Sequence, residues 1–345
     1  MRRPTLVRSI VLTAATALVV AGCGGGASTT SSKDPKAAFS AGLSGLSKTD
    51  ALTVTLKLET TADALIGFSK EDKSGGALDP TVAKEIATAE VVFETKTLNG
   101  KNLDELKPGD TNATAARFEI KDNGNTYAEL RARDNTLFMQ ADVKGALGLF
   151  QKANVYTELQ ARAGTMPPFV KALVDGKWVS LDLNVLKSLA GQLGAGAAAS
   201  PNPAVAQKLV AALKGVLQHD VTVTRVGADD QGDHLRLTAQ SRAFVTDLVA
   251  AVAGAIPGGE LILSKFKATD VPDHSIVVDA WISDGALAKL SLDIAQFAPA
   301  DQVKPGDKLP VVLTFDRSGD DISAPSGAVK VDLSQLGGLL GGLGG

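Results

Sequence analysis

Histidine beside aspartate is the combination of residues in this chain that could do acid–base or metal chemistry. Each of the three histidines, His219, His234 and His274, has an aspartate next to it. An imidazole and a carboxylate together can transfer protons or bind a metal. Each pair falls, however, at the expected end of a strand or in a turn, where polar residues are common. We therefore expect no catalytic or metal-bound histidine.

Two short clusters of aspartates are candidates for calcium binding. They are Asp229, Asp230 and Asp233 in one cluster, and Asp316, Asp320 and Asp321 in the other. Neither has the alternate spacing, the glycine and the distal glutamate of a calcium-binding EF-hand loop. Gly176-Lys177 is not a phosphate loop, since the earlier glycine and the following Ser or Thr are missing. The sequence thus predicts a protein that is not an enzyme and uses no metal or cofactor.

The single cysteine, Cys23, is the residue whose surroundings do indicate a chemistry. Basic residues Arg2, Arg3 and Arg8 precede an uncharged apolar run over residues 10–20. That run is too short to span a bilayer comfortably. A basic segment followed by a short apolar run is typical of an export signal. The run ends in Val20-Ala21-Gly22-Cys23, where small residues let a peptidase approach the backbone.

This arrangement resembles the lipobox of bacterial lipoproteins. The resemblance implies that Cys23 receives a diacylglyceryl group before cleavage makes it the new N-terminus. Residues 1–22 would then be a signal peptide, and residues 23–35 a lipidated, flexible tether at the extracytoplasmic face of the cell membrane. The other interpretation is an ordinary secretory signal that happens to contain a cysteine.

Composition limits the partners and the kind of core. Cleavage after residue 22 removes three arginines, so the formal charge falls from −3 to −6. A mildly acidic protein is not expected to bind nucleic acid, which requires a basic surface. Aromatic residues make up only 4% of the chain, so the core should be aliphatic. With its one cysteine acylated, the mature protein would form no disulfide.

Apolar periodicity predicts both strands and helices, an α+β fold. Residues 52–58 alternate between apolar and polar, which is typical of a strand with one buried face. Three further runs, over residues 115–121, 126–133 and 136–142, are separated by Asp- and Asn-rich turns and predict an antiparallel meander. Its buried face would carry Phe118, Ile120, Leu130, Leu137 and Met139. Helices are expected near residues 81–88, 143–163, 185–193, 204–218 and 244–256.

Two segments are expected to lie outside this regular structure. Residues 194–203 are rich in Gly, Ala, Ser and Pro and predict a loop at the midpoint of the chain. Residues 334–345 are mostly Gly and Leu and predict a flexible tail.

The order of these elements resembles actinobacterial LppX/LprG-type lipoproteins, which belong to the LolA-like carriers of the bacterial envelope. The resemblance rests on the helices expected after Asp142 and Leu181 and on three phrases: Gly176-Lys177-Trp178-Val179, Asp279-Ala280-Trp281-Ile282 and Ser283-Asp284-Gly285. It implies a single LolA/LppX-like domain over residues 36–333. In that fold a curved antiparallel sheet, a half-barrel, wraps around several helices, and the apolar space between them takes acyl chains.

The resemblance also implies a ligand site. The candidate cavity residues are Leu56, Phe118, Leu137, Met139, Leu209, Leu213, Phe244, Leu248 and Ile282. The expected function is that of a non-catalytic, membrane-anchored carrier of a lipid, an acylated protein or another amphiphile. The alternative is an envelope scaffold or sensor that binds proteins and has a filled core, because core leucines and cavity leucines look alike in a sequence.

The anchor can be tested by changing Cys23 to Ala. We expect the wild-type protein to sediment with membranes, because two or more acyl chains hold a protein stably whereas one does not. The variant should appear in the soluble fraction or keep its signal peptide, as membrane fractionation and mass spectrometry of the N-terminus will show. Full membrane attachment of a processed Cys23→Ala protein would contradict the anchor.

Overall fold

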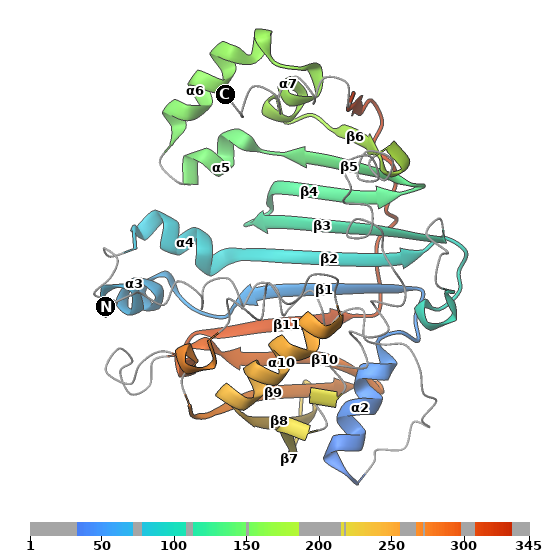
Figure 1. Cartoon of the computed structure of the whole chain (residues 1–345), viewed down its shortest axis with the longest axis vertical. Helices are drawn as coiled ribbons and strands as arrows, with labels where there is room; N and C mark the ends of the chain where they lie inside the picture. The colour runs from blue at the N-terminus through green and yellow to red at the C-terminus, as the bar shows by residue number, and fades with distance from the viewer. Residues whose placement is uncertain are drawn as a thin grey trace.

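The computed structural model (Figure 1) describes residues 33–71, 78–107, 113–149, 152–185, 215–216, 219–255, 267–271, 273–297 and 308–332. The expected signal peptide, nearly all of the tether, the midpoint loop and the tail lie outside these residues. Cys23, Leu209 and Leu213 lie outside them as well.

One large sheet organises the described chain. It has 12 strands in the order β12-β6-β5-β4-β3-β2-β1-β11-β10-β9-β8-β7. Neighbours are antiparallel except for β12 and β6, which are parallel. The strands are β1 (Ala51–Leu58), β2 (Ala89–Thr97), β3 (Thr114–Asp122), β4 (Asn125–Arg133), β5 (Thr136–Ala141), β6 (Val179–Asp182), β7 (Val221–Asp229), β8 (Gly232–Gln240), β9 (Ser275–Ser283), β10 (Ala286–Asp293), β11 (Pro310–Asp316) and β12 (Val329–Lys330). The predicted fold class, α+β with a large curved antiparallel sheet and helices, is confirmed.

The helices begin where the sequence supplies caps. Asp34 caps the first one by accepting a hydrogen bond from the Lys36 N–H, and Asp79 caps another in the same way, each followed by a proline in the first turn. The α-helices are α2 (Pro35–Gly45), α3 (Ala62–Glu71), α4 (Pro80–Thr88), α5 (Val143–Leu149), α6 (Ala153–Arg162), α7 (Pro168–Val174) and α10 (Ser241–Ala255). The prediction of one helix over residues 143–163 is wrong, because α5 and α6 are separate. Gly145 and Gly148 weaken the first of them as a helix.

Half of the sheet has a filled core. Side chains of β1 and β7–β11 pack against α2, with Leu235 and Leu287 almost completely buried. The helix approaches so closely that a Cβ at Gly45 would collide with the carbonyl oxygen of Gly285. This close packing of α2 against the start of β10 leaves no room for a ligand at that contact.

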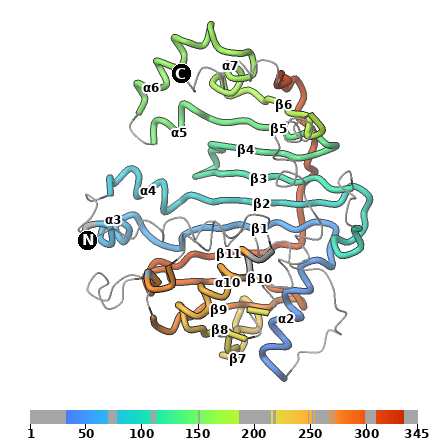
Figure 2. Tube along the Cα trace, in the orientation of Figure 1, coloured from blue at the N-terminus to red at the C-terminus, as the bar shows by residue number. Residues whose placement is uncertain are grey.

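A strap, residues 317–328, crosses the other face of the sheet between β11 and β12. Figure 2 shows this red segment running across β1–β5. Side chains of β1, β2 and β4 hold its carbonyl oxygens: Thr53 Oγ1 donates to Ser318, Lys96 Nζ to Gly319 and Arg133 Nη1 to Ile322. The strap thus carries the chain from β11, in the middle of the sheet, to β12 at its edge beside β6.

Beneath the strap lies a buried ion pair. Glu94 on β2 is fully buried, and its Oε2 lies 2.5 Å from Nη2 of Arg117 on β3. The same guanidinium nitrogen lies 3.0 Å from Oδ2 of Asp320 in the strap. Burial raises the pKa of Glu94, and the charge of Arg117 opposes that rise. Arg117 therefore compensates a buried carboxylate and fixes the strap at once.

Replacing Arg117 by Leu should lower the free energy of unfolding by about 3–5 kcal/mol, because it leaves Glu94 buried without a cation. The double variant Glu94→Leu/Arg117→Leu should recover part of that loss. Arg236→Leu is the control, since Arg236 is half exposed beside Asp279 and its loss should cost less than about 1 kcal/mol. Urea unfolding measures all three, and equal losses for the two arginines would contradict the role of the buried pair.

Candidate functional site: an apolar hollow

The floor of the candidate site is one face of β2–β6. Phe118 on β3 lies opposite Phe93 on β2 and Leu130 on β4. Leu130 in turn lies opposite Met139 on β5, which lies opposite Val179 on β6. Because side chains on a strand alternate between faces, these five residues form one apolar row across the sheet.

Two neighbouring rows on the same face are also mainly apolar. Their apolar members are Val91, Ile120, Ala128 and Ala141 on β2–β5 in one row, and Ala116, Ala132, Leu137 and Leu181 on β3–β6 in the other, whose β2 position is Thr95. Four of these eight apolar positions are alanines, whose short side chains project little from the sheet. Large side chains therefore stand between small ones, and the surface has room for flexible apolar groups.

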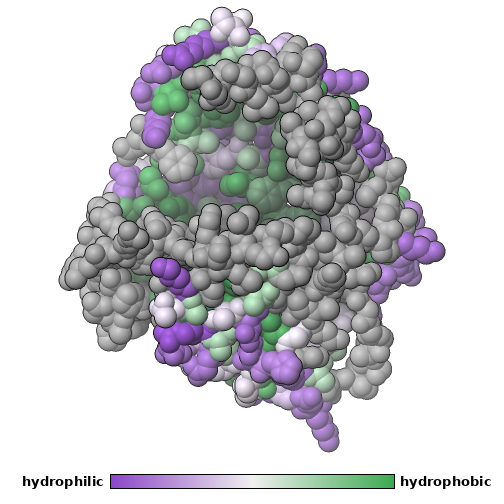
Figure 3. All heavy atoms as spheres, in the orientation of Figure 1, coloured by the Kyte–Doolittle hydropathy of each residue, from purple (hydrophilic) through white to green (hydrophobic). Residues whose placement is uncertain are grey.

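The described residues cover this floor only in part. Ile120 is 38% exposed and Leu130 is 36% exposed, whereas Leu235 on the same face of β8 is 0% exposed. Figure 3, seen from the side on which α2 and α10 lie, shows a hollow over this part of the sheet, with hydrophobic residues among those on its floor. The prediction that Ile120 and Leu130 are buried is therefore wrong, because the helices that cover the filled half do not cover them.

Short helices border the hollow. Phe169 and Ala172 of α7 pack on Val179, with Met139 partly buried against the same cluster. At the ends of the strands, α5 contacts both α4 and β4. The hollow is thus closed by α7 at its β5–β6 side and bordered by α4 and α5 at the strand ends.

The predicted cavity residues divide into separate groups. Phe118, Leu137 and Met139 lie on the floor of the hollow. Leu56, Phe244 and Ile282 instead pack against the filled core beneath α2. Leu209 and Leu213 lie outside the described residues, and the side chain of Leu248 on α10 is not described. Ile120 and Leu130 were not among the predicted cavity residues, although alternation had placed them on the same face.

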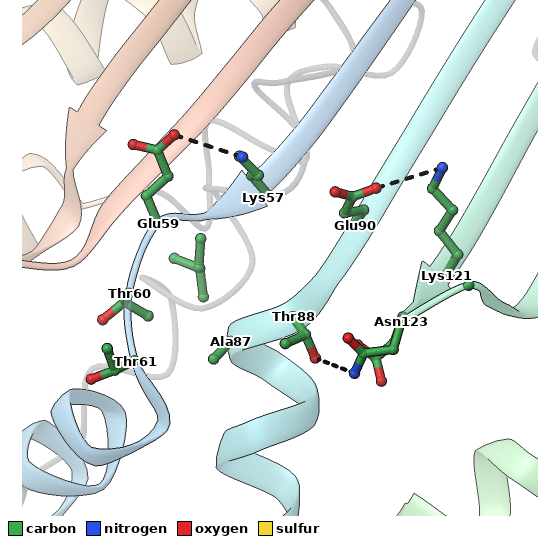
Figure 4. A pocket seen from close by; sticks show the side chains of 12 residues that line it. Lys57, Glu59, Thr60, Thr61, Ala87, Thr88, Glu90, Lys121 and Asn123 are labelled. Atoms are coloured by element: carbon green, nitrogen blue, oxygen red, sulfur yellow. Dashed lines mark hydrogen bonds and ion pairs between the residues drawn. The ribbon is translucent and has the colours of Figure 1, made fainter.

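A second, polar pocket of about 640 Å³ lies where β1, β2 and β3 meet the end of α4 (Figure 4). Its charges pair with one another: Lys57 Nζ lies 3.7 Å from Glu59 Oε1, and Lys121 Nζ lies 3.5 Å from Glu90 Oε2. Asn123 Nδ2 donates to Thr88 Oγ1 at 3.3 Å. Asp122 also lines this pocket, and its buried Oδ1 has no hydrogen-bond partner among the described residues. The paired charges around it offer a ligand less than the hollow does.

The histidines form structural contacts. His234 Nε2 lies 2.9 Å from Asp279 Oδ1, and its ring stacks on Trp281 with centroids 4.5 Å apart. His274 packs near Phe297, while His219 and Asp220 precede β7. None of the contacts given by the described residues brings a histidine beside a nucleophile.

The aspartate clusters also serve the fold. Asp229 accepts hydrogen bonds from the Trp281 indole and the Gln231 N–H, and these bonds lower its pKa. Asp320 pairs with Arg117, and Asp321 Oδ1 lies 3.7 Å from Arg133 Nη1. Across the described ranges, no group of three or more His, Cys, Asp or Glu side chains could hold a metal ion. No helix in the part of the chain that the structure describes is long and apolar enough to cross a membrane.

Comparison with known proteins gives only remote similarities. No family model matches the chain, and no curated protein matches it significantly. Among solved structures, the chain is similar to the Mycobacterium tuberculosis lipoprotein LppX, at 9% identity and a TM-score of 0.31, over 84% of this chain and 97% of that one. It is similar to LprF from Mycobacterium bovis at 10% identity and a TM-score of 0.34, over 85% and 97% of the two chains.

The resemblance to LppX/LprG-type lipoproteins that the sequence suggested is therefore also found among solved structures. Identities and TM-scores this low carry no weight for function, so the hollow is interpreted from its own geometry.

Truncation of two leucines tests whether the hollow differs from the core. Leu235→Ala should lower the free energy of unfolding by about 2–5 kcal/mol, as expected for a fully buried leucine. Leu130→Ala should lower it by about 1 kcal/mol or less, since its side chain already meets solvent. Urea unfolding measures both, and equal losses would show that the floor around Leu130 is ordinary core.

Proposed function

We propose that this protein is a non-catalytic carrier that binds acyl chains in the apolar hollow over β2–β6. The observation that carries the proposal is the partly exposed apolar floor at Ile120 and Leu130. Apolar surface left open to water is costly, and a contiguous patch of it in a concavity is typical of a binding site.

The chemistry of the floor favours flexible chains. Apart from Phe93, Phe118 and Thr95, its rows consist of Ala, Val, Leu, Ile and Met side chains. Rigid ring ligands are usually held on aromatic surfaces, whereas an aliphatic floor suits acyl chains, which bind by burial of methylene groups. The ligand is thus a lipid, the acyl chain of a lipoprotein or another amphiphile.

The N-terminus supports a location where such ligands are found. The lipobox-like stretch ending at Cys23 would hold the protein at the extracytoplasmic face of the membrane by its acyl chains. A carrier anchored there can exchange acyl chains with the bilayer surface. The proposal therefore includes a location: the protein is a lipoprotein of the cell envelope, anchored by its lipid.

Binding of a fluorescent fatty acid tests this function. The chain from Gly24 onward, which lacks the acylated cysteine, should bind cis-parinaric acid and extracted membrane lipid. Leu130→Arg should weaken binding about tenfold or more, because it places a charge on the acyl-binding floor; tenfold corresponds to about 1.4 kcal/mol. An arginine at this partly exposed position can still direct its guanidinium to water, so the fold should persist.

Val226→Arg is the matched control. Val226 is also an exposed apolar residue on a strand, but it lies on β7, at the opposite end of the sheet. It should bind the fatty acid like the wild type. If the wild-type protein binds neither the fatty acid nor extracted lipid, the carrier is excluded and the apolar face belongs to a scaffold that binds proteins.

A further inference from the structure

A pair of carboxyl groups joins α4 to the sheet beside the hollow. Asp122 ends β3 two residues after Ile120, so its side chain leaves the sheet on the same face as the floor. Asp122 is only 3% exposed, and the side chain of Glu85 on α4 is in hydrogen-bonding contact with it. Tyr127 on β4 donates a hydrogen bond of 3.4 Å to Glu85 Oε2.

This contact is incomplete without a proton. Oδ1 of Asp122 is buried, and no donor reaches it among the described residues. A carboxylate only accepts hydrogen bonds, so two of them can bond to each other only when they share a proton. A proton shared between Glu85 and Asp122 therefore lets the two carboxyl groups hydrogen-bond beside this buried oxygen.

The surrounding charges make a second negative charge costly. Burial raises the pKa of Tyr127, and the charges of Glu85, Asp122 and Asp142 add to this rise. Asp142 also caps α5 by accepting a hydrogen bond from the Gly145 N–H. Contact with Asp122 raises the pKa of Glu85, burial and the charge of Asp122 add to this, and the Tyr127 bond and Lys84 oppose it.

The other elements that α4 contacts add no close partner. They are α3, β1 and α5, whose charged residues include Asp63, Lys57 and Lys144. No interaction joins these three side chains to Glu85 in the described structure, where Lys84 is the cation that acts on it.

We propose that Glu85 and Asp122 form a proton-dependent latch that holds α4 against the ends of β3 and β4. When the pair shares a proton, it is a hydrogen bond between helix and sheet. When both groups are ionised, they repel each other and α4 is held less tightly. Since Asp122 lies next to the exposed Ile120, loosening α4 opens that end of the hollow. The latch does not depend on which ligand, if any, the hollow binds.

The direction of the pH dependence follows from linkage. Glu85 binds its proton more tightly in the folded than in the unfolded chain. Its stabilising contribution is therefore fully present below its unfolded pKa and is lost as the pH rises through its folded pKa. Docking of α4 should be tighter at acidic pH than at neutral pH.

Hydrogen exchange of the α4 amides tests the latch in the full-length protein in detergent. After correction for the intrinsic pH dependence of exchange, protection over residues 82–88 should be several-fold greater at pH 4 than at pH 7.5, because local opening governs exchange at a helix of this kind. Glu85→Gln supplies an amide donor to Asp122 at every pH. This variant should show high protection that does not change between the two pH values.

Glu90→Gln is the matched control, because Glu90 undergoes the same substitution but pairs with Lys121 on the other face of the sheet. It should keep the pH dependence of the wild type. If Glu85→Gln does not fold, Asp122→Asn must give the same loss of pH dependence. The latch is overturned if α4 protection is the same at both pH values in the wild type, or if a folded Glu85→Gln protein still responds to pH as the wild type does.

Discussion

The structure depends on one constraint, the coverage of the apolar face of a single wide sheet. Alternation puts apolar side chains on one face of the sheet, on every strand from β6 through β1 to β8 in the sheet order. That face must be covered by helices or remain in contact with water. Over β1 and β7–β11, α2 and neighbouring segments bury it. Over β2–β5, α7 covers one side and leaves Ile120 and Leu130 partly exposed. Core and hollow are therefore two parts of the same face.

The opposite face of the sheet is rich in charged side chains, and where it is covered these charges must be compensated. On β2 and β3 it carries Glu94 and Arg117, which the strap buries, and the strap contributes Asp320 to the same cluster. A buried pair of this kind adds little net stability compared with apolar packing, but it is costly to break. Its contribution is to fix where the strap crosses, and the crossing lets β12 pair in parallel with β6.

Local features of this fold were predictable, and contacts across long separations were not. The meander over β3–β5 followed from Asp- and Asn-rich turns, and Asn123, Asp134 and Asn135 do adopt positive φ. Alternation correctly placed Phe118, Leu130 and Met139 on one face. It could not show that Leu130 is exposed, since a pattern of apolar residues identifies a face and not what covers it.

Contacts such as Glu94 with Arg117 or Glu85 with Asp122 depend on strand pairing and helix docking. Neither has a signature in the chain, because each partner taken alone is an ordinary surface residue type.

The placement of the two unusual acidic residues fits the division of the sheet. Glu94 lies under the strap, where Arg117 compensates it and ionisation is supported. Glu85 and Asp122 lie at the border of the hollow, and the cation acting on Glu85 there is the exposed Lys84. A carboxyl pair without a strong counter-charge is stable only when it holds a proton, so it is the weaker of the two fastenings. A site that must admit and release an apolar ligand needs a part of its wall to be less stable than the rest. In this protein the wall element fastened by the weaker carboxyl contact is α4, and it stands beside the exposed end of the apolar floor.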